Sequence, residues 1–287
     1  MRTRLLKCKV VNAAVDWITC SSATPDAQKE LWNQGRRLLY QAEFEGEQPT
    51  RWHAHGYEGW QARSIALGAR PDGTSLRLSG SQASYEWKHA VCAAENVSRL
   101  DLAVDCQTDP PVTSLSRDIY RDARHVTPVN GRPPSRSLIV NGNGGSTAYI
   151  GARASEQFGR VYDKGVQSNS APPGTWWRWE LELKGRAAWS VASQLNRIDD
   201  PGVMICATVA SWFHKRTLHT YTTSLGSGTL VGSRNPTALE QKLLWLARGV
   251  RPTVQFLVER VGLERVLFAL GLPPQSAVER AYSDDAA

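Results

Sequence analysis

The sequence predicts an α+β protein built on a central antiparallel sheet, with flanking helices and a helical C-terminal third. Three observations support this fold class. Short segments with period-two alternation occupy much of the first 184 residues, turn-forming Gly and Pro residues separate them, and the apolar spacing becomes helical after that point. Strands gathered first and helices gathered later are typical of α+β domains.

The first 95 residues predict a strand, a helix, a group of short strands and a second helix. Residues 9–20 alternate in part and predict the first strand. Residues 24–43 predict a helix, because three leucines share one face and a proline stands near the start. A Pro-Asp-Gly turn signal separates the short strands that follow. These later elements are short strands within 56–69 and 74–80 and a helix around 81–95.

The rest of the chain predicts further strands and then helices. An irregular stretch with five prolines covers residues 108–137, around one short helix at 115–123. The expected strands are 99–105, 137–141, 147–153, 158–164 and 176–184. The expected helices are 185–198, 203–216, 237–249 and 252–270, followed by a polar tail from residue 273.

Composition narrows the class of protein. The chain has 34 basic and 27 acidic residues, and its net charge of +7 favours a polyanionic partner. Its 11 Trp residues can fill a core or stack on nucleic-acid bases. No apolar run reaches the roughly 18 residues of a membrane span, and no secretory signal is evident, so we expect a cytoplasmic protein without a membrane partner. The five cysteines are scattered without a CxxC pair, which indicates reduced thiols.

Two of the predicted strands carry acidic faces. Asp101 and Asp105 share one face of the strand 99–105, and Glu180 and Glu182 share one face of the strand 176–184. If the strands are neighbours, the four carboxylates converge and need a cation, for which Mg²⁺ or Mn²⁺ suits oxygen ligands. The alternative is a solvated sheet face that nearby cations balance. Those cations are Arg99, Arg178 and Lys184.

A tyrosine stands between two cations on another predicted strand. Tyr162 has Arg160 and Lys164 two residues away on either side, so alternation puts all three on one face. Such an environment favours the phenolate and also holds a phosphate. A phenolate beside a divalent metal is what a nuclease with a covalent protein–DNA intermediate needs. The alternative is a packed tyrosine with a hydrogen-bonded hydroxyl.

A series of short motifs runs in order along residues 10–260. They are VDWI at 15–18, GYE at 56–58, LRLSG at 76–80, RLDLAVD at 99–105, TAYIGARAS at 147–155, RVYDK at 160–164, RWELE at 178–182, KLLWL at 242–246 and VRPT at 250–253. In these motifs the chain resembles the replication initiation factor family, the rolling-circle replication initiators of plasmids and filamentous phages.

The resemblance implies a relaxase-like sheet related to the HUH endonucleases, a divalent metal, Mg²⁺ or Mn²⁺, and a catalytic tyrosine. By this match Tyr162 is the nucleophile, and it nicks and rejoins one DNA strand through a covalent 5′-phosphotyrosine. Arg160 and Lys164 neutralise charge at the phosphate. The metal ligands by the same match are Asp101, Asp105, Glu180 and Glu182.

Other residues compete for these roles. Tyr149 also lies on an alternating strand and is the alternative nucleophile. His53 and His55 form a His–apolar–His pair, the metal motif of other HUH nucleases, but their segment is polar and Gly-rich, which favours an exposed loop. Two rival functions also stay open: a non-catalytic DNA-binding regulator with the same fold, and a metallonuclease that uses water as nucleophile.

The residues also predict DNA contacts and domains, and the resemblance implies partners. Arg153 and Ser155 follow a glycine turn and can hold phosphates, and Arg178 and Lys184 are assigned to DNA as well. The expected domains are a DNA-nicking domain (1–200), a helical region packed on it (201–272) and a disordered tail (273–287). The expected partners are single-stranded or cruciform origin DNA, a host helicase, a single-strand-binding protein and a second copy of the chain.

Overall fold

The computed structural model describes residues 8–124, 133–142, 144–217, 257–258 and 260–269. The chain divides into two compact units, Met1–Ser233 and Arg234–Ala287. In the second unit the described residues include α9 (Leu263–Ala269), which lies inside the helix predicted over 252–270, and that helix is interrupted at residue 262. The predicted helix at 237–249 and the tail from 273 lie outside the described residues. The predicted division at residue 200 and the packing of the whole region 201–272 therefore stay predictions.

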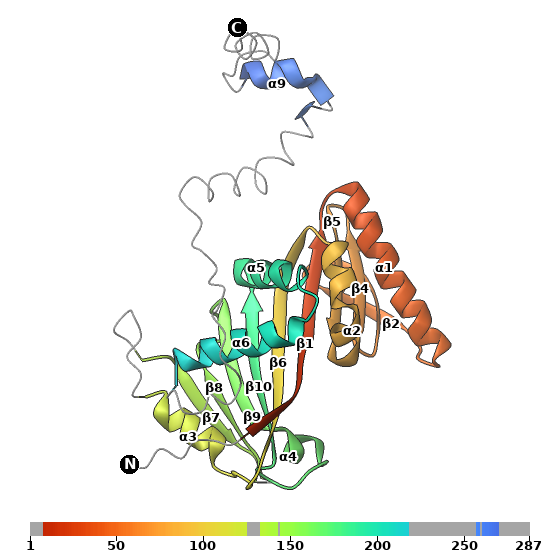
Figure 1. Cartoon of the computed structure of the whole chain (residues 1–287). Coiled ribbons are helices and arrows are strands. Elements are labelled where there is room, and N and C mark those ends of the chain that lie inside the picture. Colours follow the sequence, from red (N-terminus) through yellow and green to blue (C-terminus); the bar gives the residue numbers. More distant parts are fainter. Residues whose placement is uncertain (1–7, 125–132, 143, 218–256, 259, 270–287) are drawn as a thin grey trace. The chain divides into compact units, whose positions relative to one another are not determined.

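The described part of the first unit holds a ten-stranded sheet in which every neighbouring pair is antiparallel, in the order β2-β3-β4-β5-β1-β6-β10-β9-β8-β7 (Figure 1). This confirms the predicted α+β fold class. The strands are β1 (Cys8–Ser22), β2 (Thr50–Ala54), β3 (Tyr57–Ala62), β4 (Ile65–Arg70), β5 (Gly73–Ser79), β6 (Asn96–Thr108), β7 (Arg136–Val140), β8 (Ser146–Ile150), β9 (Gln157–Asp163) and β10 (Trp176–Lys184).

Helices cover one face of this sheet. In Figure 1, α1, α2, α5 and α6 lie in front of the strands. The side chains beneath them come from alternate strand positions and are buried, as with Leu102, Trp179 and Val161. The helices are α1 (Pro25–Phe44), α2 (Gly80–Cys92), α3 (Leu115–Asp122), α4 (Lys164–Ser168), α5 (Gly185–Leu195) and α6 (Pro201–His214).

Helix α6 is seated directly on the strands that matter for the site. Trp212 and Phe213 are buried against β9, where Gly159 has no side chain. A Cβ at Gly159 would collide with the Trp212 ring and would stand 2.8 Å from Phe213 Cζ. The two rings meet edge to face, with centroids 4.8 Å apart. A close-packed apolar layer therefore backs β9 and fixes the opposite, polar face.

Most of the predicted elements in the first unit lie within a few residues of their expected bounds, but β2 was not predicted, and one boundary departs for a clear local reason. The strand predicted over 158–164 ends at Asp163, and Lys164 begins α4. The cause is local, since the Asp163 carboxylate accepts hydrogen bonds from the backbone N–H of Val166, at 3.1 Å, and of Gly174, at 2.5 Å. The first bond caps the short helix and turns the chain out of the sheet. Within the described residues, no helix has the length and apolarity needed to cross a membrane.

Candidate functional site

The face opposite the helices carries the predicted site residues. β10 lies between β6 and β9, so the condition that the two acidic strands are neighbours is met. Residues directly opposite one another in a sheet point to the same face. Opposed pairs across β10 are Asp101 with Glu182, Asp105 with Arg178, Arg160 with Glu180 and Tyr162 with Arg178.

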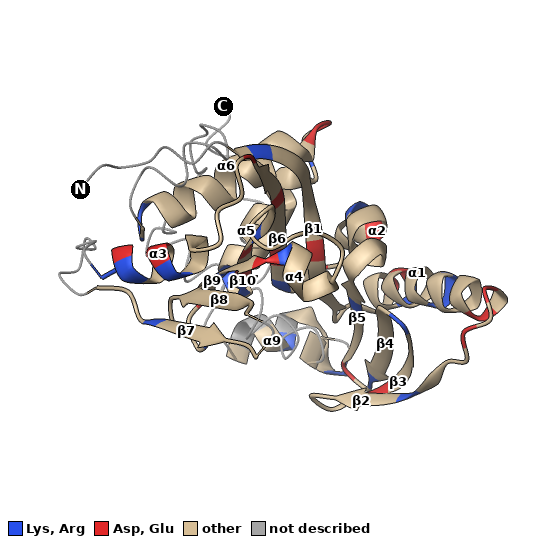
Figure 2. Cartoon of the chain, turned by 90° about the horizontal axis from the view of Figure 1, so that it is seen from below, with Lys and Arg blue, Asp and Glu red and all other residues tan. Residues whose placement is uncertain are grey.

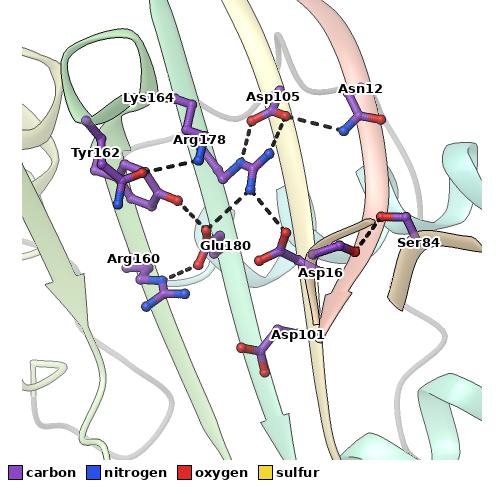
Figure 3. Close-up of polar contacts among 12 residues, drawn as sticks. Asn12, Asp16, Ser84, Asp101, Asp105, Arg160, Tyr162, Lys164, Arg178 and Glu180 are labelled. Atoms are coloured by element: carbon purple, nitrogen blue, oxygen red, sulfur yellow. Dashed lines mark hydrogen bonds and ion pairs between the residues drawn. The ribbon is translucent and has the colours of Figure 1, made fainter. Parts of the chain in front are cut away.

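Glu180 stands at the centre of this face and binds the predicted nucleophile. The Tyr162 hydroxyl donates a hydrogen bond to Glu180 Oε1 at 2.5 Å, and Arg160 Nε forms an ion pair with Oε2 (Figure 3). Glu180 is only 2% exposed and Tyr162 8%. One buried carboxylate therefore holds the phenol with one oxygen and a guanidinium with the other.

Arg178 gathers a second set of carboxylates. It binds Asp105 in a bidentate manner, with Nε 2.6 Å from Oδ1 and Nη2 2.7 Å from Oδ2. Its Nη1 lies 3.2 Å from Asp16 Oδ1 and 3.9 Å from Glu180 Oε1. Asn12 Nδ2 adds a hydrogen bond to Asp105 Oδ2 at 3.3 Å. Three carboxylates thus share one guanidinium, which neutralises charges that would otherwise repel in a buried setting.

Asp16 belongs to this site, although no role for it was predicted from the sequence. β1 carries a bulge at this point, since Val15 pairs with Leu102 whereas Trp17 pairs with Asp101. Val15 points into the core and is 1% exposed, and strict alternation would place Trp17 beside it. The extra residue instead lets both Asp16 and Trp17 leave the core side. The only sequence signal was the acidic residue inside the VDWI motif.

A third arginine holds the remaining two predicted metal ligands. Arg99 binds Asp101 in a bidentate manner, at 2.9 Å and 2.7 Å, and its Nη2 lies 3.1 Å from Glu182 Oε2. Lys184 Nζ pairs with Glu182 Oε1 at 2.9 Å. The four carboxylates therefore form two pairs, each bridged by an arginine: Asp101 with Glu182, and Asp105 with Glu180.

The protonation preferences follow from burial and from these pairs. Burial, followed by the neighbouring Glu180 charge, raises the pKa of Tyr162, so the expectation that flanking cations favour its phenolate is wrong. Burial also raises the pKa of Asp101 to about 6, although Arg99 opposes the shift. Burial alone would lower the pKa of Arg178, but the hydrogen bond and charge of Asp105 outweigh it and raise that pKa.

The four predicted carboxylate ligands are of the chemical type that binds a magnesium or manganese ion, but they are not arranged around one position. Carboxylate oxygens are the ligands these ions prefer. Among the residues that the structure describes, however, no three His, Cys, Asp or Glu side chains stand close enough together to hold a metal ion. The Arg178 and Arg99 guanidiniums occupy the positions that the carboxylate pairs share. The residues as placed therefore form ion pairs rather than a metal cage.

Several predicted site residues lie apart from the Tyr162 hydroxyl. Lys164 is outside the strand, and its ammonium contacts Gln167 Oε1 at 3.3 Å. The Ser155 hydroxyl lies 2.6 Å from the carbonyl of Ala152 and 2.5 Å from that of Gln157, so it closes the turn between β8 and β9. Arg153 is exposed, with its guanidinium 5.5 Å from the Phe158 ring centre, and Lys184 bonds the Arg153 carbonyl.

The competing residues are also placed. Tyr149 lies opposite Arg160 on β8, on the same face as Tyr162, and is more exposed. Its ring stacks on Phe158 with centroids 5.6 Å apart. The expected loop is wrong for His53, which is exposed but lies on β2, whereas His55 lies in the tight turn after that strand with φ 52°. His55 is therefore outside the alternating strand that the His–apolar–His motif requires.

Comparison with known proteins identifies the family. The family model described as "Replication initiation factor" matches residues 95–265, which is more than half of the chain. The chain belongs to the replication initiation factor family. The matched segment contains every residue that the sequence analysis assigned to catalysis, metal or DNA, whereas Asp16 and the strands β2–β5 precede it.

The fold is shared with a solved replication initiator. The chain is similar to the rolling circle replication initiator protein from Geobacillus stearothermophilus, with a TM-score of 0.52 and 19% identity over 78% of this chain and 89% of the other. No curated protein matches the sequence. The family is that of replication initiators, and the fold is that of a rolling-circle initiator.

Proposed function

We propose that this replication initiator starts rolling-circle replication by nicking one strand of origin DNA, with Tyr162 as the nucleophile. The observation that supports this most directly is the hydrogen bond from the Tyr162 hydroxyl to Glu180 Oε1. A nucleophile, a base bonded to it and a third group that orients the base are the parts of an activated nucleophile. Arg160, on the other oxygen of Glu180, is that third group.

The chemistry follows from the protonation state. Because burial raises the pKa of Tyr162, the hydroxyl enters the reaction as a neutral phenol. As its oxygen bonds to the scissile phosphorus, the proton passes to Glu180 Oε1, and the bond from phosphorus to the 3′ oxygen breaks. The 3′ oxygen takes a proton from solvent. The products are a 5′-phosphotyrosine and a free 3′-hydroxyl, and the reverse transfer rejoins a strand.

Arg160 and Arg178 have different electrostatic roles in this mechanism. Arg160 is about one-third exposed beside the phenol and stabilises the phosphate charge that develops during attack. Arg178 is largely buried and fully engaged with Asp105 and Asp16, so in this mechanism it positions Glu180 rather than binding DNA directly. Arg153 lies in the β8–β9 turn, and Lys184 at the end of β10 contacts that turn, so both supply contacts to the phosphate backbone of the DNA strand. Lys164 supplies another contact from α4.

Dependence on Mg²⁺ or Mn²⁺ stays a prediction, because the carboxylates as placed form ion pairs with arginines and the mechanism above has no step on a metal. A divalent ion would polarise a non-bridging phosphate oxygen. The proton transfer described here requires only side chains of the chain. The assay below therefore includes arms with Mn²⁺, with Mg²⁺ and with chelator. The expected host helicase, single-strand-binding protein and dimeric partner likewise stay predictions.

The test is covalent adduct formation on single-stranded origin DNA, read on a denaturing gel. We expect wild type to form an adduct, Tyr162→Phe to form none, and both to bind DNA equally. Tyr149→Phe is the matched control, because it removes a hydroxyl from the same face. Adduct from Tyr162→Phe but not from Tyr149→Phe would overturn the assignment.

The same gel separates the rival functions. A DNA-binding regulator gives neither cleavage nor adduct with any metal. A water-using metallonuclease cleaves without a covalent product and retains activity in Tyr162→Phe. The buried hydrogen bond between phenol and carboxylate favours the tyrosine mechanism over both.

A further inference from the structure

A row of alternating aromatic and guanidinium groups crosses the sheet beside the site. The guanidinium carbons of Arg99 and Arg77 lie 4.5 Å and 5.3 Å from the ring centre of Trp17. Arg77 lies 5.4 Å from the Trp52 ring as well. On β3 and β4 a further pair stacks at 4.6 Å. We call this set the stacking ladder, and it comprises Arg99, Trp17, Arg77, Trp52, Tyr57 and Arg70.

The stacking ladder lies on the same face as the Tyr162 site. Trp17 opposes Asp101 on β6, and Thr19 opposes both Arg99 and Arg77 on the neighbouring strands. Trp52 opposes Gly59, which opposes Gly68 on β4. The ladder therefore runs across β6, β1, β5 and the outer strands. Arg99, at the inner end of the ladder, donates a hydrogen bond to Asp101, so the ladder adjoins the acidic residues of the site.

The sheet makes room for these rings. A Cβ added at Gly68 would stand 2.6 Å from Trp52 Cζ3 and 3.0 Å from Tyr57 Cβ. The absent side chain lets the Trp52 indole lie across the strands instead of standing away from them. Trp17, Trp52 and Tyr57 are all only partly buried. Each of the three aromatic side chains thus keeps part of its surface exposed, beside the guanidinium that lies over its ring.

The stacking ladder differs from the site around Glu180 in how its arginine charges are balanced. Arg99 is neutralised by Asp101 and Glu182, but Arg77 forms no ion pair among the described residues. Burial and the nearby Arg99 charge both lower the pKa of Arg77, which marks a cation without a compensating anion. A guanidinium held between two indoles attracts a ligand that carries both a negative charge and flat rings.

We propose that the stacking ladder binds single-stranded DNA next to the nicking site, with bases stacked on Trp52, Trp17 and Tyr57 and a backbone phosphate at Arg77. The proposed function enters this inference at one point only, because it identifies the bound DNA as the strand that is nicked. Aromatic platforms with interleaved cations suit unpaired strands, because every base has a free face there. In a duplex the base faces are already stacked, so the rings would find no partner.

The opposite side of the same strands offers a matched control. Arg51 lies over the Trp60 ring at 4.2 Å, and the two residues oppose one another on β2 and β3. Each neighbours a residue of the Trp52–Gly59 pair along its strand, so alternation places them on the other face of the sheet. Arg51→Gln therefore removes an equivalent cation–π contact without touching the stacking ladder.

The experiment measures fluorescence anisotropy of a labelled oligothymidylate of about 30 nucleotides with the full chain, at about 50 to 200 mM salt. We expect Trp52→Leu to weaken binding about 5- to 100-fold, as for the loss of one stacked base, and Trp52→Phe to weaken it less. Arg77→Gln should reduce the logarithmic salt slope by about 0.7, the value for one phosphate contact on a single strand. Arg51→Gln should change neither quantity.

Two outcomes overturn the proposal: equal effects of Arg77→Gln and Arg51→Gln, or binding of wild type to duplex DNA as tight as to the single strand. Melting temperatures accompany each variant, and if Trp52→Leu unfolds, Trp52→Phe and Arg77→Gln decide the question. The adduct assay is independent of this result. If wild type binds the oligothymidylate through the stacking ladder but forms no adduct, the proposed nicking fails while the binding site stands.

Discussion

Arginines line one face of the sheet in two regions and do different work in each. At the centre, on β6, β9 and β10, Arg99, Arg160 and Arg178 are bonded to carboxylates, and acidic and basic ribbon segments lie side by side (Figure 2). On the outer strands, Arg77 and Arg70 stack on aromatic rings. The centre is thus an internally neutralised network, whereas at Arg77 the outer region keeps a charge available to a ligand.

The same residue type therefore serves two purposes in this protein. A buried ion pair is costly to break but gives a fixed geometry, which suits a base that must point at one hydroxyl. A cation stacked on an indole keeps its hydrogen-bond donors free at little cost, which suits a mobile phosphate backbone. The predictions below test whether the centre carries chemistry and stability while the outer region carries DNA binding.

The largest expected effect comes from Glu180→Gln. An amide keeps the size of the carboxylate but cannot take the Tyr162 proton. The adduct rate should fall about 10²- to 10⁴-fold, the usual contribution of a positioned general base. The measurement is single-turnover adduct formation, with oligothymidylate affinity as the companion quantity.

Glu182→Gln is the control for that variant, since Glu182 lies on the same strand and contacts Arg99 and Lys184 rather than the phenol. A fall confined to Glu180→Gln supports the assignment of the base. Equal losses in both variants would mean that the acidic face acts as a whole and that Glu180 has no special role.

Loss of an arginine should cost more stability at the centre of the sheet than on the outer strands. Arg178→Met leaves Asp105 buried without its bidentate partner, so the free energy of unfolding should fall by about 3–5 kcal/mol. Arg77→Met removes no ion pair among the described residues and should cost less than about 1 kcal/mol. Chemical denaturation of both variants, read by tryptophan fluorescence, measures the two values, and comparable losses would contradict the division of roles.

The sequence predicted which acidic residues share a face of the sheet, but not all of the side-chain contacts on that face. Alternation over 99–105 and 176–184 placed Asp101, Glu182 and their neighbours together, because strand periodicity is local and regular. The bulge that frees Asp16 depends on how β1 registers against β6, which no local pattern records. The alternative in which Arg99, Arg178 and Lys184 balance the carboxylates named cations that do form these ion pairs. It was wrong about solvent, because Asp101, Asp105 and Glu180 are buried, and burial is set by tertiary packing.

Two further departures have local causes that are visible only in the fold. Lys164 leaves the strand because the Asp163 carboxylate caps the turn that follows. The pKa of Tyr162 is raised because burial outweighs the flanking cations, one of which is spent on Glu180. The sequence shows which charged residues lie next to a tyrosine along the chain, but the loss of solvent that shifts its pKa depends on tertiary burial.

A change at Gly68 tests the outer strands separately from the site around Glu180. Gly68→Ala pushes a methyl group into the Trp52 ring, so overpacking should cost about 1–3 kcal/mol and shift the indole. We expect weaker oligothymidylate binding and an unchanged adduct rate on a short oligonucleotide that covers only the nick. Gly142→Ala, where a Cβ meets nothing within 4 Å, is the control. An adduct rate that falls as far as binding would show that the two regions act as one.

The smallest effect concerns the pH dependence of stability at the junction of the two regions. Folding raises the pKa of Asp101 from 3.8 to about 6, so ionising this carboxyl is harder in the folded chain than in the unfolded chain. Its contribution to the free energy of unfolding is therefore full below about pH 4 and declines as the pH rises through about 6. Asp101→Asn removes this decline but also weakens the contact with Arg99. The stability advantage of wild type over Asp101→Asn should accordingly shrink by about 2 kcal/mol between about pH 4.5 and 7. Urea midpoints across that range measure the difference, and an advantage that grows with pH would show that Arg99 dominates over burial at this carboxyl.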